Sequence, residues 1–125
     1  MTKLFLAIAG ILGGFAVIIG AFASHALKEQ LSEKYLAIFE TGVRYQMYHA
    51  LALLLVALLL TQFELAPTAL VVAGFAFIAG VVIFSGSLYA LSLTEIKWLG
   101  AITPLGGVGF IVGWACLVVA AFNFK

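Results

Sequence analysis

The sequence predicts an all-α membrane protein: a bundle of four transmembrane helices, with a short amphipathic interfacial segment between the first and second helix. Composition is the first reason, because 66% of the 125 residues are hydrophobic and 9% are charged. The mean hydropathy of +1.27 is the second, since a water-soluble domain of this size needs more charge to cover its large exposed surface. The third is that the charges leave four stretches long enough for the roughly 20 apolar residues that span a bilayer. These stretches run from Lys3 to Lys28, Arg44 to Glu64, Glu64 to Glu95 and Lys97 to Lys125.

We expect the first helix over residues 4–25. Lys3, the apolar stretch and the Ala-Phe-Ala run at residues 21–23 also resemble a secretory signal with its cleavage site. The apolar stretch is longer than the roughly 7–15 residues of such a signal, so we interpret it as a membrane helix. Small residues recur at helical spacing, as at Gly10 and Gly14, and such spacing lets helices approach closely in lipid.

The amphipathic segment is expected over residues 33–41. Ser32 is a suitable N-cap, and apolar and polar residues then alternate as in a helix lying along the membrane surface. Gly42 is expected to let the chain bend inward, and the second membrane helix to follow over residues 43–61. One continuous helix from Glu33 to Thr61 is the competing geometry.

The last two helices follow short connections. Pro67 suits the first position of a helix, where its missing N–H has no partner to lose, so the third helix is expected over residues 67–91. Thr103 and Pro104 form an N-cap and first-position pair, so the fourth helix is expected over residues 104–123. The whole chain is then one integral membrane domain.

The basic residues predict an orientation. An even number of helices puts both termini on one side of the membrane, and Lys and Arg favour the cytoplasmic side. The termini carry Lys3 and Lys125, whereas the opposite side carries Lys28, Lys34, Arg44 and Lys97. We therefore expect the termini outside a bacterial cytoplasmic membrane. The net charge of +1 leaves no basic surface for nucleic acid.

A polar cluster opens the second helix. Glu40, Arg44 and Tyr48 share one helix face at four-residue spacing, and Tyr45 and His49 lie on an adjacent face. An unpaired arginine within lipid is costly, and either pairing of Arg44 with Glu40 or snorkelling of its side chain would remove much of that cost. The favoured interpretation is structural, with the arginine and tyrosines anchoring the helix end at the headgroups. The alternative is a functional site, because ionisable residues at membrane depth often carry function.

The two histidines, His25 and His49, can approach each other if the first two helices form an antiparallel hairpin. Facing imidazoles could ligate haem or relay protons, but no motif supports haem, so we expect no cofactor and ordinary hydrogen bonds within the bundle. Serines in the third helix are expected to bond a backbone carbonyl or a neighbouring helix. The complete candidate cluster is His25, Glu40, Arg44, Tyr45, Gln46, Tyr48, His49, Ser85, Ser87 and Tyr89.

No pattern indicates an enzyme. The sequence has no nucleophile elbow, no phosphate-binding loop and no pair of acids placed for proton transfer. Its single cysteine, Cys116, can form neither an internal disulfide nor a cysteine-rich metal site, and a packing role suits it better. We therefore expect no catalytic residue and no metal.

Several runs together resemble a known family, the YgdD/YwdK type of small bacterial membrane proteins (domain of unknown function 423). The most specific run is Phe-Glu-Thr-Gly-Val-Arg-Tyr-Gln-Met-Tyr-His-Ala at residues 39–50. The others lie at residues 20–22, 25–28, 84–89, 102–107 and 113–114. The resemblance covers the chain and implies a multi-pass protein of the cytoplasmic membrane. It implies no activity, because none is established for the family.

Two functions remain open. The favoured one is a non-enzymatic structural or accessory component of a membrane assembly, surrounded by lipid and associated with further copies or with another membrane protein. Its basis is the number of small-residue helix faces. The alternative is a small transporter or channel in which Glu40, Arg44, His25 and His49 line a polar path. A lipid-embedded enzyme or redox carrier is less favoured.

Overall fold

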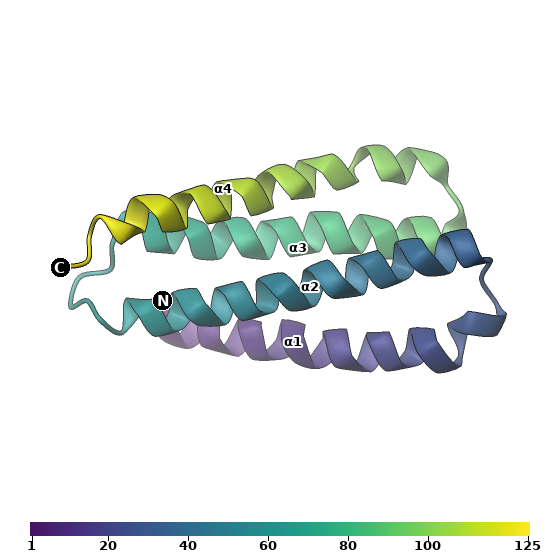
Figure 1. Cartoon of the computed structure of the whole chain (residues 1–125), viewed down its shortest axis with the longest axis horizontal. Helices are drawn as coiled ribbons and strands as arrows, with labels where there is room; N and C mark the ends of the chain where they lie inside the picture. Colours follow the sequence, from purple (N-terminus) through teal and green to yellow (C-terminus); the bar gives the residue numbers. More distant parts are fainter.

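The computed structural model describes residues 1–125 and is entirely helical. Successive long helices run in opposite directions along the bundle, and both termini lie at one end (Figure 1). The long helices are α1 (Thr2–His25), α2 (Glu33–Leu60), α3 (Thr68–Thr94) and α4 (Thr103–Ala121), and the short 3-10 helices are η1 (Leu27–Glu29) and η2 (Lys97–Ala101). The span that contains each long helix is long and apolar enough to cross a membrane, which confirms the prediction of an all-α chain with four such helices.

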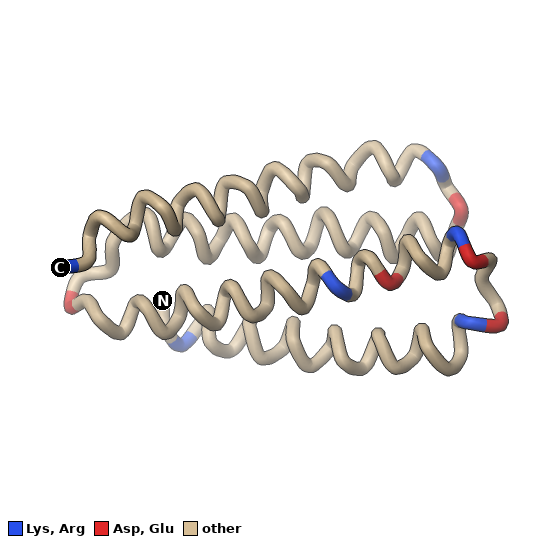
Figure 2. Tube along the Cα trace, viewed as in Figure 1, with Lys and Arg blue, Asp and Glu red and all other residues tan.

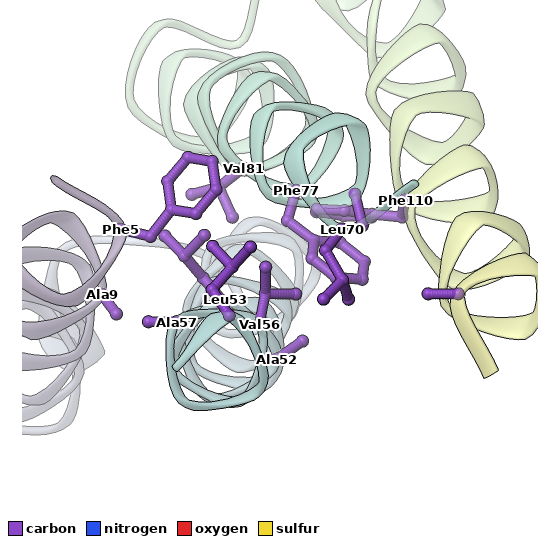
Figure 3. Packing of buried hydrophobic residues seen from close by; sticks show 13 residues of the cluster. Phe5, Ala9, Ala52, Leu53, Val56, Ala57, Leu70, Phe77, Val81 and Phe110 are labelled. Carbon is purple, nitrogen blue, oxygen red and sulfur yellow. The ribbon is translucent and has the colours of Figure 1, made fainter. Parts of the chain in front are cut away.

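The two middle helices form the centre of the bundle. α1 packs on α2, α2 on α3 and α3 on α4, so that α1 and α4 lie on opposite flanks (Figure 3). Large side chains fill the shared core, including Phe5 from α1, Leu53 from α2, Phe77 from α3 and Phe110 from α4. Only four residues of α1 and four of α4 are buried, so both flanks present long apolar faces to the surroundings.

α2 differs from the prediction. Residues 33–41 are the first turns of one helix that continues through Gly42 to Leu60, so the expected bend at Gly42 is wrong and the continuous geometry is observed. Gly42 is buried and has a packing role instead of the expected role in bending the chain. A Cβ built on it would lie 2.8 Å from the ring of Tyr89, so its missing side chain admits a neighbouring helix. Ser32 caps α2 as predicted, its hydroxyl accepting from the backbone N–H of Tyr35.

The other helix ends shift by a few residues. α3 continues past residue 91 to Thr94 and ends where Glu95 adopts a left-handed conformation with φ of 59°, a common way to end a helix. Pro67 lies just before α3 instead of at its first position. Thr103 is inside α4 and its side chain does not cap the helix, because its hydroxyl bonds a serine of α3. α4 ends at Ala121, before the expected residue 123.

Charged residues gather at the two ends of the bundle, as Figure 2 shows. The end with η1 and η2 carries most of them, and the end with the termini carries few. The middle of the bundle is uncharged apart from Glu40 and Arg44, which lie inward from the charged start of α2. A bundle charged mainly at its ends suits a bilayer about 30 Å thick in its hydrocarbon core.

Candidate functional site

The ten candidate residues divide according to the surface that carries them. The structure buries Gln46, His49, Ser85 and Ser87 between helices and half-buries Tyr89. The exposed or partly exposed members are His25, Glu40, Arg44, Tyr45 and Tyr48. The cluster is therefore two groups, an interior set of hydrogen bonds and an outward-facing charged and aromatic set.

Gln46 is the centre of the interior set. Its amide Nε2 donates to the backbone carbonyl of Leu12 in α1 over 2.8 Å, and its Oε1 accepts from the Tyr89 hydroxyl of α3 over 2.7 Å. One side chain of α2 thus joins both neighbouring helices. We refer to Leu12, Gln46 and Tyr89 as the Gln46 network. Both partners fix the orientation of the amide, because a backbone carbonyl can only accept.

Two serines of α3 bond adjacent helices, as expected. Ser85 Oγ donates to the Gly42 carbonyl over 2.7 Å, and this carbonyl is reachable because Gly42 has no side chain. Ser87 Oγ lies 2.6 Å from Thr103 Oγ1 of α4 and also donates to the Phe84 carbonyl at 3.0 Å. A serine has one hydroxyl proton, so when Ser87 donates it to the carbonyl, Thr103 is the donor in the hydroxyl pair.

His49 joins α2 to α4. Its Nδ1 lies 2.8 Å from the Tyr45 carbonyl, and its Nε2 lies 3.1 Å from Trp114 Nε1. A carbonyl can only accept and an indole N–H can only donate, so the two partners require the neutral tautomer with the proton on Nδ1. The imidazole also stacks on Phe110, with ring centres 3.5 Å apart and planes at 8°. Both ring nitrogens are therefore engaged by protein groups.

The predicted approach of the two histidines does not occur as a contact. His25 is the exposed last residue of α1, whereas His49 is buried against Trp114 and Phe110. The first reason is depth, because Gly13 packs beside Ala50 and Gly20 beside Val43, so that His49 is level with the middle of α1 while His25 is at its end. The rotation of α2 also turns His49 toward α4 and presents Gln46 to α1.

The pairing of Glu40 with Arg44, one of the two expected possibilities, is also absent. Arg44 Nη2 donates to Thr41 Oγ1 over 3.2 Å, and no ion pair joins Arg44 to an acid. Helical side chains point toward the N-terminus of their own helix, so Arg44 reaches back along α2 to Thr41. That direction also carries the guanidinium toward the charged end of the bundle, as snorkelling of a long basic side chain would.

Two tyrosines accompany Arg44 with different surroundings. Tyr45 stacks on Phe84 of α3 with ring centres 4.7 Å apart, so its ring belongs to the α2–α3–α4 seam although it is partly exposed. Tyr48 is 52% exposed and lies 5.6 Å from Tyr45 between ring centres. Arg44 and Tyr48 therefore form the part of the cluster that faces away from the bundle.

Sequence reasoning missed three contributors to the interior set: Trp114, Phe110 and Thr103. Trp114 and Phe110 lie four residues apart on α4 and both contact His49. That aromatic pair at helical spacing was the available signal, since such residues share a face. Thr103 carried no such signal, because its expected role as a cap accounted for it.

The arrangement joins helices and leaves nothing unpaired. No buried side-chain nitrogen or oxygen lacks a hydrogen-bond partner. No three His, Cys, Asp or Glu residues come together in a group able to hold a metal. Chemically, the interior set can fix the register and rotation of four helices, and only the outward set offers free donors to another molecule.

Comparisons with known proteins identify the family to which the chain is similar. The model of the family described as "Protein of unknown function (DUF423)" matches residues 19–107, a range that contains the whole candidate cluster. The chain is 48% identical to the UPF0382 membrane protein YwdK of Bacillus subtilis over 98% of each chain. It is 45% identical to a UPF0382 membrane protein of Staphylococcus aureus, again over 98% of each. No solved structure matches the chain.

Proposed function

The chain belongs to the DUF423 family, whose relatives here are membrane proteins of unknown function, and from this premise we propose that it is a non-enzymatic structural or accessory component of a membrane assembly. In this proposal the protein acts through its outer surface. Its partners are further copies of the chain or another membrane protein.

One observation carries the proposal: the interior of the bundle is closed and self-sufficient. Every buried polar side-chain atom has a partner within the chain, and both hollows of the surface lie at one end of the bundle, where α2 and α4 finish. A substrate path or an active site needs polar groups free to meet a ligand. An interior whose donors and acceptors are all paired supports a scaffold instead.

The positions of the residues proposed to line a polar path do not favour the transporter alternative. His49 is buried against α4, Arg44 faces outward, and His25 is exposed at the end of α1, so these groups do not line one route. Measured from Leu60, Arg44 lies about 24 Å along α2, so with Leu60 at one edge of a core about 30 Å thick, Arg44 is within about 6 Å of the other edge. With Tyr48 beside it, this supports an anchor at the headgroups.

In-membrane cross-linking tests the proposal. A photoreactive residue at Gly10 of α1 or at Ile111 of α4 would report a partner, because nothing lies within 4 Å of a Cβ at Gly10 and Ile111 is 69% exposed. We expect a stoichiometric adduct from at least one of the two flanks in native membranes.

The matched control places the same residue at Leu65, which is 88% exposed but lies in the connection between α2 and α3. It should give no stoichiometric adduct. Recovery of free monomer alone from both flanks would contradict the proposal. An ion or proton flux in proteoliposomes that depends on Arg44 would favour the transporter instead.

A further inference from the structure

A groove runs between α2 and α4 at the end of the bundle that carries the termini. All six residues that line it are apolar, and its volume is about 360 Å³, within the range of small-molecule sites. It is open along its length, since Leu55 is 44% and Phe124 39% exposed. The lining residues are Leu55, Leu59, Leu117, Ala120, Ala121 and Phe124.

The sequence of α4 explains the groove. Toward the middle of the bundle, the Trp114 indole bonds His49 and bridges α2 and α4. Toward the end that carries the termini, the last turn of α4 places Ala120 and Ala121 opposite Leu59. A methyl group is too short to fill the space that an indole spans one or two turns earlier. The groove therefore lies between the Trp114–His49 contact and the end of α4, and it is open laterally.

The outer end of the groove meets a second, polar hollow of about 490 Å³. Phe124 lines both, and its ring packs edge-on against Phe63 with centres 4.8 Å apart. The polar hollow adds Gln62, Asn123 and Lys125. No ion pair engages the Lys125 side chain, and the only acidic side chain at this end, Glu64, is not part of the lining.

The groove and the polar hollow lie at different depths, as the acyl chain and the headgroup of a lipid do. The groove lies along the final turns of α2, which ends at Leu60, and the polar hollow begins just beyond that end at Gln62. If the four helices span a bilayer, the groove is in hydrocarbon and the polar hollow is at the headgroups. A cation beside amide side chains suits a phosphate.

We propose that the groove and the polar hollow together bind one anionic phospholipid, with an acyl chain between α2 and α4 and the headgroup phosphate at Lys125 and Asn123. The site would distinguish this lipid from the surrounding bilayer by the seat for its chain and by its charge. The inference is independent of the proposed assembly function.

Native mass spectrometry of the full chain tests it, with phosphatidylglycerol and phosphatidylcholine of identical acyl chains as the probes. We expect the first phosphatidylglycerol to bind about fivefold more tightly than phosphatidylcholine, the effect of one accessible charge. Lys125→Gln should abolish that preference and retain binding of both lipids. Lys3→Gln, a cation outside the polar hollow, should preserve the preference.

Ala121→Phe tests the chain seat, because it fills the groove from an exposed position. We expect it to weaken the first binding event for both lipids about tenfold. Val118→Phe is the matched control, since Val118 is 65% exposed on the same helix and does not line the groove. Equal binding by these two variants would show an unselective lipid annulus and overturn the proposal, as would tight binding of glycerol phosphate without acyl chains.

A second measurement separates a lost site from a lost fold. In a Trp98→Phe background, Trp114 is the remaining tryptophan, near the inner end of the groove. Phosphatidylglycerol brominated on its acyl chain should quench Trp114 with saturation at one lipid, and Ala121→Phe should remove that saturable part. An unchanged saturable part in Ala121→Phe, with the helical circular dichroism of the parent, would also overturn the proposal.

Discussion

The Tyr89 hydroxyl is a single atom whose removal tests the Gln46 network. Tyr89→Phe deletes its bond to Gln46 Oε1 and retains the ring contact with Phe39, whose centre lies 4.9 Å away. Hydrogen bonds between membrane helices contribute about 0.6 kcal/mol on average and up to about 1.7 kcal/mol. We expect Tyr89→Phe to lower the free energy of unfolding toward the upper part of that range, because Gln46 Oε1 is left buried without a donor. Unfolding in mixed micelles with increasing SDS measures this.

Tyr48→Phe is the control for that measurement. It removes the same atom from a tyrosine that is 52% exposed and has no hydrogen-bond partner in the bundle. It should leave the free energy of unfolding unchanged within about 0.5 kcal/mol. Equal losses in Tyr48→Phe and Tyr89→Phe would mean that the Gln46 network does not hold α3 to α2.

Glu40 and Arg44 should contribute to stability independently. Arg44 donates to Thr41 and forms no ion pair with Glu40, so removing one side chain does not strand the charge of the other. We expect the effects of Glu40→Ala and Arg44→Ala to add within about 0.5 kcal/mol in a double-mutant cycle. A coupling energy well above that value, from the same SDS titration, would indicate an ion pair that forms in the bilayer.

At the scale of the helices, α3 and α4 meet through glycine. A Cβ on Gly106 would collide with the backbone of Phe84, whereas a Cβ on Gly107 would have nothing within 4 Å. Backbone cannot rotate away as a side chain can, so Gly106→Ala must push the two helices apart. We expect it to lower the free energy of unfolding by about 1–3 kcal/mol.

Gly107→Ala supplies the matched control, one residue further along the same helix. It adds the same methyl group to open space and should change the free energy by no more than about 0.5 kcal/mol in either direction. Thermal unfolding in detergent, followed by circular dichroism, compares the two variants. If both melted alike, the close approach of α4 to Phe84 would be absent in solution.

The existence of the four helices followed from the sequence because it depends on composition. An uncharged apolar stretch has few alternatives to a helix in lipid, and each stretch became one. The ends and bends did not follow, because they depend on neighbours. Gly42 predicted a bend by its flexibility, yet it is helical since Tyr89 and Ser85 approach it. Nothing local distinguishes a glycine for bending from a glycine for packing.

The candidate site was also predictable only in part, because its polar residues could be recognised locally but their partners could not. Gln46 and His49 stood out as polar residues in an apolar helix, and such residues are usually hydrogen-bonded in the interior. Their partners lie far away in sequence, at Leu12, Tyr89 and Trp114. Which of these partners each polar side chain bonds depends on the rotation of α2, and only the packed bundle defines that rotation. The same rotation turned Arg44 outward.

For the whole molecule, the uneven charge of its two ends predicts an orientation. The end with η1 and η2 carries Lys28, Lys34 and Lys97, and the other end carries Lys3 and Lys125. Basic residues near membrane helices favour the cytoplasm, so η1 should be cytoplasmic and the α2–α3 connection external. In a Cys116→Ala background, Leu65→Cys should react with an impermeant maleimide in intact cells.

The opposite end of the bundle provides the control and a test of whether its basic residues cause the orientation. Glu29→Cys in η1, in the same background, should react only after the cells are lysed. If the basic residues determine this arrangement, replacing Lys28, Lys34 and Lys97 with glutamine leaves the terminal end more basic among the residues outside the membrane. Glu29→Cys should then become reactive in a substantial part of intact cells. Labelling of Glu29→Cys but not Leu65→Cys in the parent would mean that the termini are cytoplasmic and that the thin excess of basic residues does not orient this bundle.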